Sequence, residues 1–148
     1  MPIPSFTKEG LLPPGIHTCS LDDLRARFGS FQGSDRRPNL MQKFETFLTE
    51  VRASKIVRAI IINGSFVTSR ETPNDIDLLL VLPAAHDFRA DLGPAQYMVL
   101  NSRRVQRVYG LDPFIVEEQS ADYAALVRLF QRVRLQPGLT KGMLRIEL

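Results

Sequence analysis

Two apolar segments separated by a short polar stretch constrain the fold of this chain more than any other feature. Residues 56–62 are rich in β-branched side chains, and residues 75–82 become continuously apolar after two opening acids. Both patterns are typical of buried strands. The stretch between them, residues 64–74, has room for a turn and a short helix but not for a parallel crossover with a long helix. We therefore expect these strands to be neighbours in one sheet.

Helix and strand signals alternate along the rest of the 148 residues. Capping residues and apolar spacing predict helices, and β-branched or alternating runs predict strands. We expect helices over 21–28, from 39 to at least 51, over 94–109 and from 120 to about 130, and further strands over 111–116 and 142–148. This order predicts an α/β or α+β fold with a mixed sheet flanked by helices.

The amino-terminal residues 1–19 differ from the remainder of the chain. They contain Pro2, Pro4, Pro13 and Pro14, together with two glycines, and these residues disfavour a regular helix. The segment is expected to form an extended arm packed on the domain of residues 20–148. A composition of 44% hydrophobic and 24% charged residues fits one compact domain.

Composition also indicates the cellular compartment in which the protein is expected. Cys19 is the single cysteine, so no intramolecular disulfide can form and a reducing compartment is favoured. The sequence shows no signal-peptide pattern and no stretch near the roughly 18 apolar residues of a membrane span. A cytoplasmic protein with no membrane partner is therefore expected. The net charge of +3 is too small to indicate nucleic-acid binding by itself.

The chemically informative motif lies between the two central strands. Gly64 and Ser65 follow the first strand, and after nine residues Asp75 and Asp77 open the second. Strand residues at i and i+2 share a face, so the two carboxylates should point into one space, where a hard cation such as Mg²⁺ or Mn²⁺ would neutralise them. A glycine lets a phosphate approach the backbone, and a serine adds a hydroxyl and an N–H group. The motif therefore suits a metal-bound polyphosphate.

This segment resembles the core motif of the nucleotidyltransferase superfamily related to DNA polymerase β. The resemblance implies a minimal nucleotidyltransferase domain in which Gly64 and Ser65 hold the phosphates of an NTP. It also implies that Asp75 and Asp77 bind two divalent metal ions, with Asp112 as the third acid. The expected activity is transfer of an NMP from an NTP to a hydroxyl acceptor. Arg70 and Lys141 are further candidates for contact with the triphosphate.

A weaker likeness extends over nearly the whole chain. The segments 12–17, 40–51, 63–69 and 130–148 are similar to small, mostly uncharacterised bacterial proteins of the nucleotidyltransferase type. That likeness implies a bacterial origin and a place in a toxin–antitoxin or phage-defence system. The acceptor, which would be a protein, an RNA or a small molecule, and the preferred NTP do not follow from the sequence.

Simpler interpretations stay open for several residues. Gly64 and Ser65 also suit an ordinary turn, and Asp75 also suits a strand cap. Glu117 and Glu118 compete with Asp112 for the role of third acid, and Pro113 suggests an edge strand or a bulge after Asp112.

Two other classes of function also remain. One is a nucleotide- or partner-binding module without turnover. The other is a nucleic-acid-binding protein that uses arginines on two helices. The two histidines lack the spacing of a zinc site and are expected to be structural or on the surface. The arginines are Arg103, Arg104, Arg107, Arg128, Arg132 and Arg134, and the histidines are His17 and His86.

Overall fold

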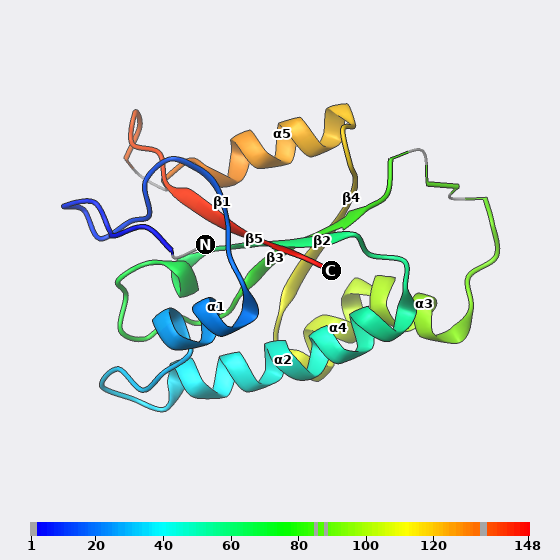
Figure 1. Cartoon of the computed structure of the whole chain (residues 1–148), viewed down its shortest axis with the longest axis horizontal. Helices are drawn as coiled ribbons and strands as arrows, with labels where there is room; N and C mark the ends of the chain where they lie inside the picture. The colour runs from blue at the N-terminus through cyan, green and yellow to red at the C-terminus, as the bar shows by residue number, and fades with distance from the viewer. Residues whose placement is uncertain (1–2, 85, 88, 134–135) are drawn as a thin grey trace.

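A computed structural model of the chain describes residues 3–84, 86–87, 89–133 and 136–148. Its strands are Gly15–Thr18 (β1), Ala59–Asn63 (β2), Asp77–Leu82 (β3), Asp112–Glu117 (β4) and Gly142–Glu147 (β5). They form one sheet in the order β1-β5-β2-β3-β4 (Figure 1). β1 is parallel to β5 and β4 is parallel to β3, whereas β2 is antiparallel to both of its neighbours. The fold is thus α+β with a mixed sheet, as the sequence predicts.

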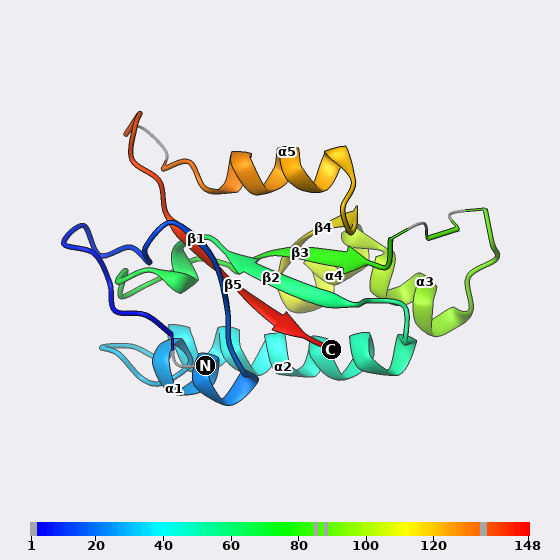
Figure 2. The same cartoon turned by 45° about the horizontal axis from the view of Figure 1, so that its top comes forward.

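Helices cover both faces of this sheet. They are Leu21–Phe28 (α1), Arg36–Ser54 (α2), Pro94–Leu100 (α3), Ser102–Tyr109 (α4) and Ala121–Phe130 (α5), with a single 3₁₀ turn at Ser65–Val67 (η1). Figure 2 shows α5 over one face and α2 under the other. Leu78 and Leu80 of β3 belong to the larger core beside α2, and Leu79 and Val81 to the core beside α5. Because both faces are covered, β3 is apolar from Leu78 to Leu82. No helix in the described part of the chain is long and apolar enough to cross a membrane.

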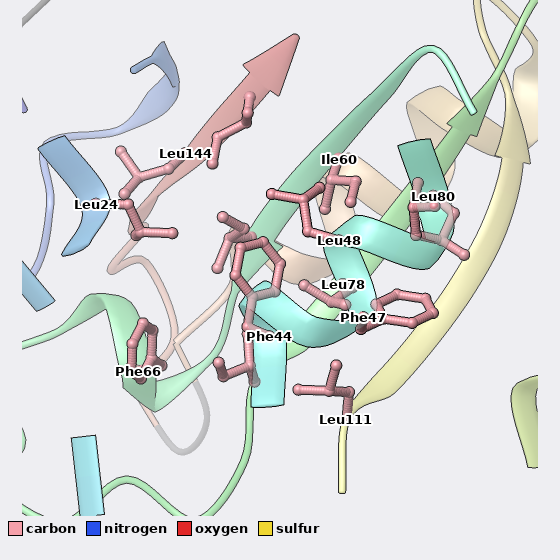
Figure 3. Close-up of a cluster of buried hydrophobic side chains, with 14 of the residues drawn as sticks. Leu24, Phe44, Phe47, Leu48, Ile60, Phe66, Leu78, Leu80, Leu111 and Leu144 are labelled. Atoms are coloured by element: carbon pink, nitrogen blue, oxygen red, sulfur yellow. The ribbon is translucent and has the colours of Figure 1, made fainter. Parts of the chain in front are cut away.

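The larger core explains the apolar spacing of α2. Phe44, Phe47 and Leu48 lie on one side of this helix and face Ile60 and Leu78 of the sheet (Figure 3). Each of these five side chains is at most 1% exposed. Burial of one such side chain stabilises a fold by about 1.5–3 kcal/mol, so this contact fixes α2 against the sheet.

Two helices differ from the sequence-based expectation. α2 begins at Arg36 rather than Asn39, because Pro38 falls in its first turn, where a missing N–H group costs no helical hydrogen bond. The single helix expected over 94–109 is instead α3 and α4. Asn101 separates them with an extended backbone at ψ 93°, and its side chain accepts a hydrogen bond from the Arg104 N–H to cap α4. Asparagine favours this capping geometry over continuing a helix.

The amino-terminal arm contains a strand that the sequence analysis did not predict. β1 lies within the proline-rich segment and pairs with β5 from Gly15 to Thr18. Upstream of it, Arg27 of α1 donates hydrogen bonds to the carbonyls of Ile3 and Pro4. The backbone N–H of Gly142 donates to the carbonyl of Leu12, which is fully buried. These contacts pack the arm along the sheet.

Candidate functional site

The predicted site residues meet where four strands begin or end. β2 ends at Asn63 and pairs there with Asp77, the first residue of β3. In the parallel β3/β4 pair, Asp77 is opposite Asp112, the first residue of β4. Neighbouring strands are about 4.8 Å apart, so the acids on β3 and β4 are adjacent on the sheet. Lys141 directly precedes β5, which starts beside this same end of β2.

These side chains also share the face of the sheet that α5 covers. Side chains alternate along a strand, so Asp77 is on the same face as Leu79, and Asp112 on the same face as Val116. Leu79, Val116 and Met143 all belong to the core beside α5. By the same alternation Asn63 and Lys141 lie on that face. Asp75 precedes β3 and is half-buried like Asp77, while Ile76 between them is fully buried in the opposite core.

Gly64 occupies a backbone conformation that suits glycine alone. Its φ is +90°, and a Cβ added there would lie 2.8 Å from Oδ2 of Asp77. Any other residue would therefore be strained and would also collide with this acid. The turn η1 begins at the next residue, Ser65, whose carbonyl accepts a hydrogen bond from the Thr68 hydroxyl. The expected short helix in this segment is thus one 3₁₀ turn, and Ser65 is half-buried at its start.

Mutual electrostatics link the three acids. Burial, followed by the charges of Asp75 and Asp112, raises the pKa of Asp77 to about 6, and Lys141 opposes this shift. Burial and Asp75 likewise raise the pKa of Asp112. Burial lowers the pKa of Lys141, although the charge of Asp77 acts in the opposite direction. The site is therefore an acidic cluster whose negative charge Lys141 only partly neutralises.

Two residues that sequence reasoning missed hold the site in shape. Arg37 of α2 is 1% exposed and donates hydrogen bonds to the carbonyls of Phe28, Phe66, Thr68 and Arg70. This guanidinium fixes the segment that follows Gly64. Arg37 precedes the helix predicted from residue 39, and no local sequence pattern reveals carbonyl partners that are distant in the chain.

Asn63 is the second missed residue. It is 3% exposed, and its Nδ2 donates to the carbonyl of Phe130 at the end of α5 over 3.2 Å. Its Oδ1 is buried without a hydrogen-bond partner. Because an unsatisfied buried oxygen costs about 1–3 kcal/mol, this atom marks a place where a ligand or water would find an acceptor. Arg70, by contrast, is exposed and is held through its backbone: its carbonyl accepts from Arg37 and its N–H donates to the Thr68 hydroxyl.

The acids match a divalent cation by the chemistry of their donor atoms. Three carboxylates are the hard oxygen donors that Mg²⁺ or Mn²⁺ prefers, and they come from two adjacent strand ends. Among the described residues, however, no group of three His, Cys, Asp or Glu side chains converges on one point suited to an ion. Binding of a cation at this site would therefore require the carboxylates to rotate toward a common centre.

Comparison with known proteins assigns the chain to a family without assigning an activity. Residues 4–147 match a family of unknown function, DUF6932. The chain belongs to the DUF6932 family. No curated protein and no solved structure matches it significantly. What this DUF6932 chain does must therefore be argued from its own site.

The rival acids lie at the other end of the DUF6932 sheet. Glu117 pairs with Leu82 at the far ends of β4 and β3. Glu118 forms ion pairs with Arg58 and Arg145. Asp112 is therefore the acid on this strand that lies beside Asp77, as the sequence analysis predicts. Pro113 is accommodated because β4 is an edge strand, and the ladder with β3 continues through it.

Several other sequence candidates have structural roles in this DUF6932 chain. His17 contacts the carbonyl of Pro13 through Nε2 at 2.8 Å. Burial raises the pKa of the Cys19 thiol to about 11, which disfavours the nucleophilic thiolate. Arg104 pairs with Glu50 at 2.7 Å. Arg103, Arg107, Arg128 and Arg132 are exposed, and Arg134 lies outside the described residues.

A hollow of about 430 Å³ lies in the loop between α5 and β5. It is lined by Arg132, Val133 and the residues 136–140, and so ends one position before Lys141. None of the three acids lines it. The acidic cluster at the sheet end therefore lies outside this hollow, which precedes Lys141 in the chain.

Proposed function

We propose that this protein is a metal-dependent nucleotidyltransferase that moves an NMP from an NTP to a hydroxyl acceptor and releases pyrophosphate. One observation carries the proposal: Asp77 and Asp112 are register partners on adjacent strands, and Asp75 and Asp112 both raise the pKa of Asp77. Three acids so close together are costly unless a cation binds among them. The adjacent left-handed Gly64 gives a phosphate access to the backbone.

Each candidate residue has a distinct role in this proposal. Asp75 and Asp77 would hold Mg²⁺ or Mn²⁺, and Asp112 would complete the ligand set on the side of the acceptor. The bound cations would stabilise the attacking and leaving oxygens. Gly64 and Ser65 would hold the phosphates through backbone and hydroxyl groups.

The cationic side chains would contact phosphate oxygens, and one acid would also accept a proton. Lys141, already beside Asp77, is placed to meet a phosphate oxygen once cations neutralise the acids. Arg70 exposes a second cationic side chain on the segment that follows Gly64 and is the other candidate for this contact. Asp112 would accept the proton of the acceptor hydroxyl.

The nature of the acceptor belongs to the proposal as well. The acceptor would bind beside the sheet or arrive with a partner. The weaker family likeness favours a bacterial toxin–antitoxin or phage-defence system, with a protein, an RNA or a small molecule as the acceptor. The single cysteine favours the cytoplasm. The acceptor and the base preference are open to direct measurement.

The first experiment measures nucleotide binding by thermal melting. Each of the four NTPs with Mg²⁺ or Mn²⁺ should be compared with NTP in EDTA and with metal alone. We expect at least one metal–NTP pair to raise Tm beyond either control, because a ligand of the folded state stabilises it by mass action. Absence of any shift with all four NTPs at millimolar concentration would remove the basis of the proposal.

A second experiment separates turnover from binding. An α-labelled NTP, metal and a total cell extract are incubated with the wild type or with Asp112→Asn, and labelled products are identified. We expect the wild type to label an acceptor and Asp112→Asn to keep most NTP binding while losing transfer. The acids do not yet converge on one point, which favours a binding module without turnover as the alternative. That alternative would be supported if the wild type bound NTP but labelled nothing.

A further inference from the structure

An aromatic pair lies on the same face of the sheet as the acidic cluster. Phe114 follows Asp112 by two positions on β4, so the two side chains lie on the same face of the sheet. The ring of Phe114 meets that of Phe130, from the end of α5, edge to face at a centroid distance of 5.2 Å. Phe114 nevertheless remains 39% exposed. Phe114 is on the edge strand β4, and within the described residues no further strand pairs with the outer side of that strand.

The alternation along β4 shows that this exposure is specific to the face with the acids. Pro113 is buried, and Ile115 packs on the core beside α2. Phe114 and Asp112 instead face α5. A large aromatic ring at this position is not required for the main core, since the side chain is partly in water. The ring therefore forms an apolar surface directly next to the polar site.

The aromatic pair is also tied to the site from the other side. The carbonyl of Phe130 accepts the hydrogen bond from Asn63, the strand partner of Asp77. The same Asn63 side chain leaves its buried Oδ1 without a partner. The Asn63 side chain thus anchors the end of α5 through its Nδ2 and keeps a buried acceptor, Oδ1, without a partner beside the acids. Phe130 is held in place behind Phe114, so the exposed ring rests on a fixed support.

We propose that Phe114, supported by Phe130, is a stacking surface for a nucleobase. This inference rests on the proposed function and specifies its substrate. The acids, Gly64 and Lys141 recognise phosphate and metal, and none of them offers a flat apolar surface. An exposed aromatic ring supplies that surface, because stacking of a base on a ring is worth about 1–3 kcal/mol and tolerates any base. The base belongs either to the NTP or to a nucleotide acceptor that binds on the side of Asp112.

The test compares ligands with and without a base. Binding of ATP, of inorganic tripolyphosphate and of a short single-stranded RNA, each with Mg²⁺, is measured for the wild type, Phe114→Leu and Phe114→Tyr. We expect Phe114→Leu to weaken ATP or the RNA by about tenfold and to leave tripolyphosphate unchanged, with Phe114→Tyr close to the wild type. A loss for ATP assigns the ring to the NTP, and a loss for the RNA alone assigns it to the acceptor.

Controls keep this test independent of folding and of the parent proposal. Tyr97→Leu removes an aromatic side chain that is 61% exposed on α3, a helix that packs with α2, and should change no affinity. Phe114→Met replaces the leucine variant if that protein does not fold. The inference is overturned if the wild type binds ATP and RNA and Phe114→Leu binds both equally well. If the wild type binds neither tripolyphosphate nor ATP, the proposed function itself fails.

Discussion

The surroundings of Asp77 disfavour the charged form of its carboxyl group. It is half-buried, it pairs with Asn63 and Asp112 through the backbone, and its carboxylate feels two other acids. The result is a pKa of about 6, above the ordinary value of 3.8. A group whose pKa rises on folding binds its proton more tightly in the folded state. Its ionisation therefore destabilises the fold.

The pH dependence of stability follows from this sign. The folded and unfolded states bind equal numbers of protons at Asp77 below pH 3.8, stability then falls as pH rises toward 6, and the loss is complete above that value. It amounts to about 3 kcal/mol at most. Asp77→Asn removes the effect. Urea unfolding at pH 4 and pH 8 should show the variant gaining stability over the wild type at the higher pH. A variant less stable than the wild type at pH 8 would mean that the acid is structural.

Gly64 gives a second prediction for a single residue. Gly64→Ala places a methyl group 2.8 Å from the Asp77 carboxylate and strains a φ of +90°. We expect a loss of stability of about 1–3 kcal/mol and loss of metal-dependent NTP binding. Gly33→Ala is a matched control, because its φ is +82° but its added Cβ meets only Glu71 at 3.8 Å. Equal effects of the two variants on NTP binding would show that contact with Asp77 is unimportant.

Between elements, the site depends on α2 as much as on the strands. Arg37 connects the first turns of α2 to the end of α1 and to the segment after η1 through four carbonyl oxygens. Its guanidinium lies 5.2 Å from the centre of the Phe66 ring, which adds a cation–π contact. Burial lowers the pKa of this arginine. Its planar guanidinium group carries several N–H donors, so it can bind several carbonyl oxygens at once. The segment beyond Gly64 is thus held by a helix that precedes it in the chain.

Replacing this arginine should loosen the segment. Arg37→Met leaves several buried carbonyls without donors, so we expect a loss of at least about 3 kcal/mol in the free energy of unfolding. Arg36→Met is the control, since Arg36 is exposed and its guanidinium makes a long contact of 3.5 Å with Oδ1 of Asn74. Chemical denaturation of the two variants measures the difference. Similar stability for both would show that the carbonyls find other donors.

Across the whole molecule, the amino-terminal arm connects regions that are far apart in sequence. The backbone N–H of Ser69, on the segment after Gly64, donates to the carbonyl of Gly10. Two residues further along the arm, Leu12 accepts from Gly142 at the start of β5. The arm thereby braces both segments that flank the acidic cluster. In Figure 1 it is drawn in blue at the end of the sheet near η1.

This brace can be tested at its tightest contact. A Cβ at Gly142 would lie 2.0 Å from the carbonyl oxygen of Pro13, so Gly142→Ala must push the arm away from β5. We expect a loss of about 1–3 kcal/mol and faster proteolysis of the arm. Gly93→Ala, whose added Cβ meets no atom within 4 Å, should change stability less. Comparable melting temperatures for the two variants would show that the arm is not fixed by this contact.

Local patterns in the sequence were sufficient for much of the fold. The capping box of Ser20 and Asp23, the Ser120 cap and the buried runs of β2 and β3 all act over a few residues, and the structure confirms each. Gly64, Asp75 and Asp77 were placed at adjacent strand ends in the same way, from the local patterns of the two strands that they flank. A break such as that at Asn101 was missed because its apolar spacing continues across it, and only the extended backbone interrupts the helix.

By itself, then, the sequence determined the central strands and most helix ends, because hydrophobic periodicity and capping are short-range properties. Tertiary structure alone decided the pairing of β1 with β5, the carbonyl partners of Arg37 and the orphaned oxygen of Asn63. It also brought Phe114 against Phe130 beside Asp112. Each of these depends on contacts between residues distant in the chain, whose partners no local pattern specifies until strands are ordered and helices packed.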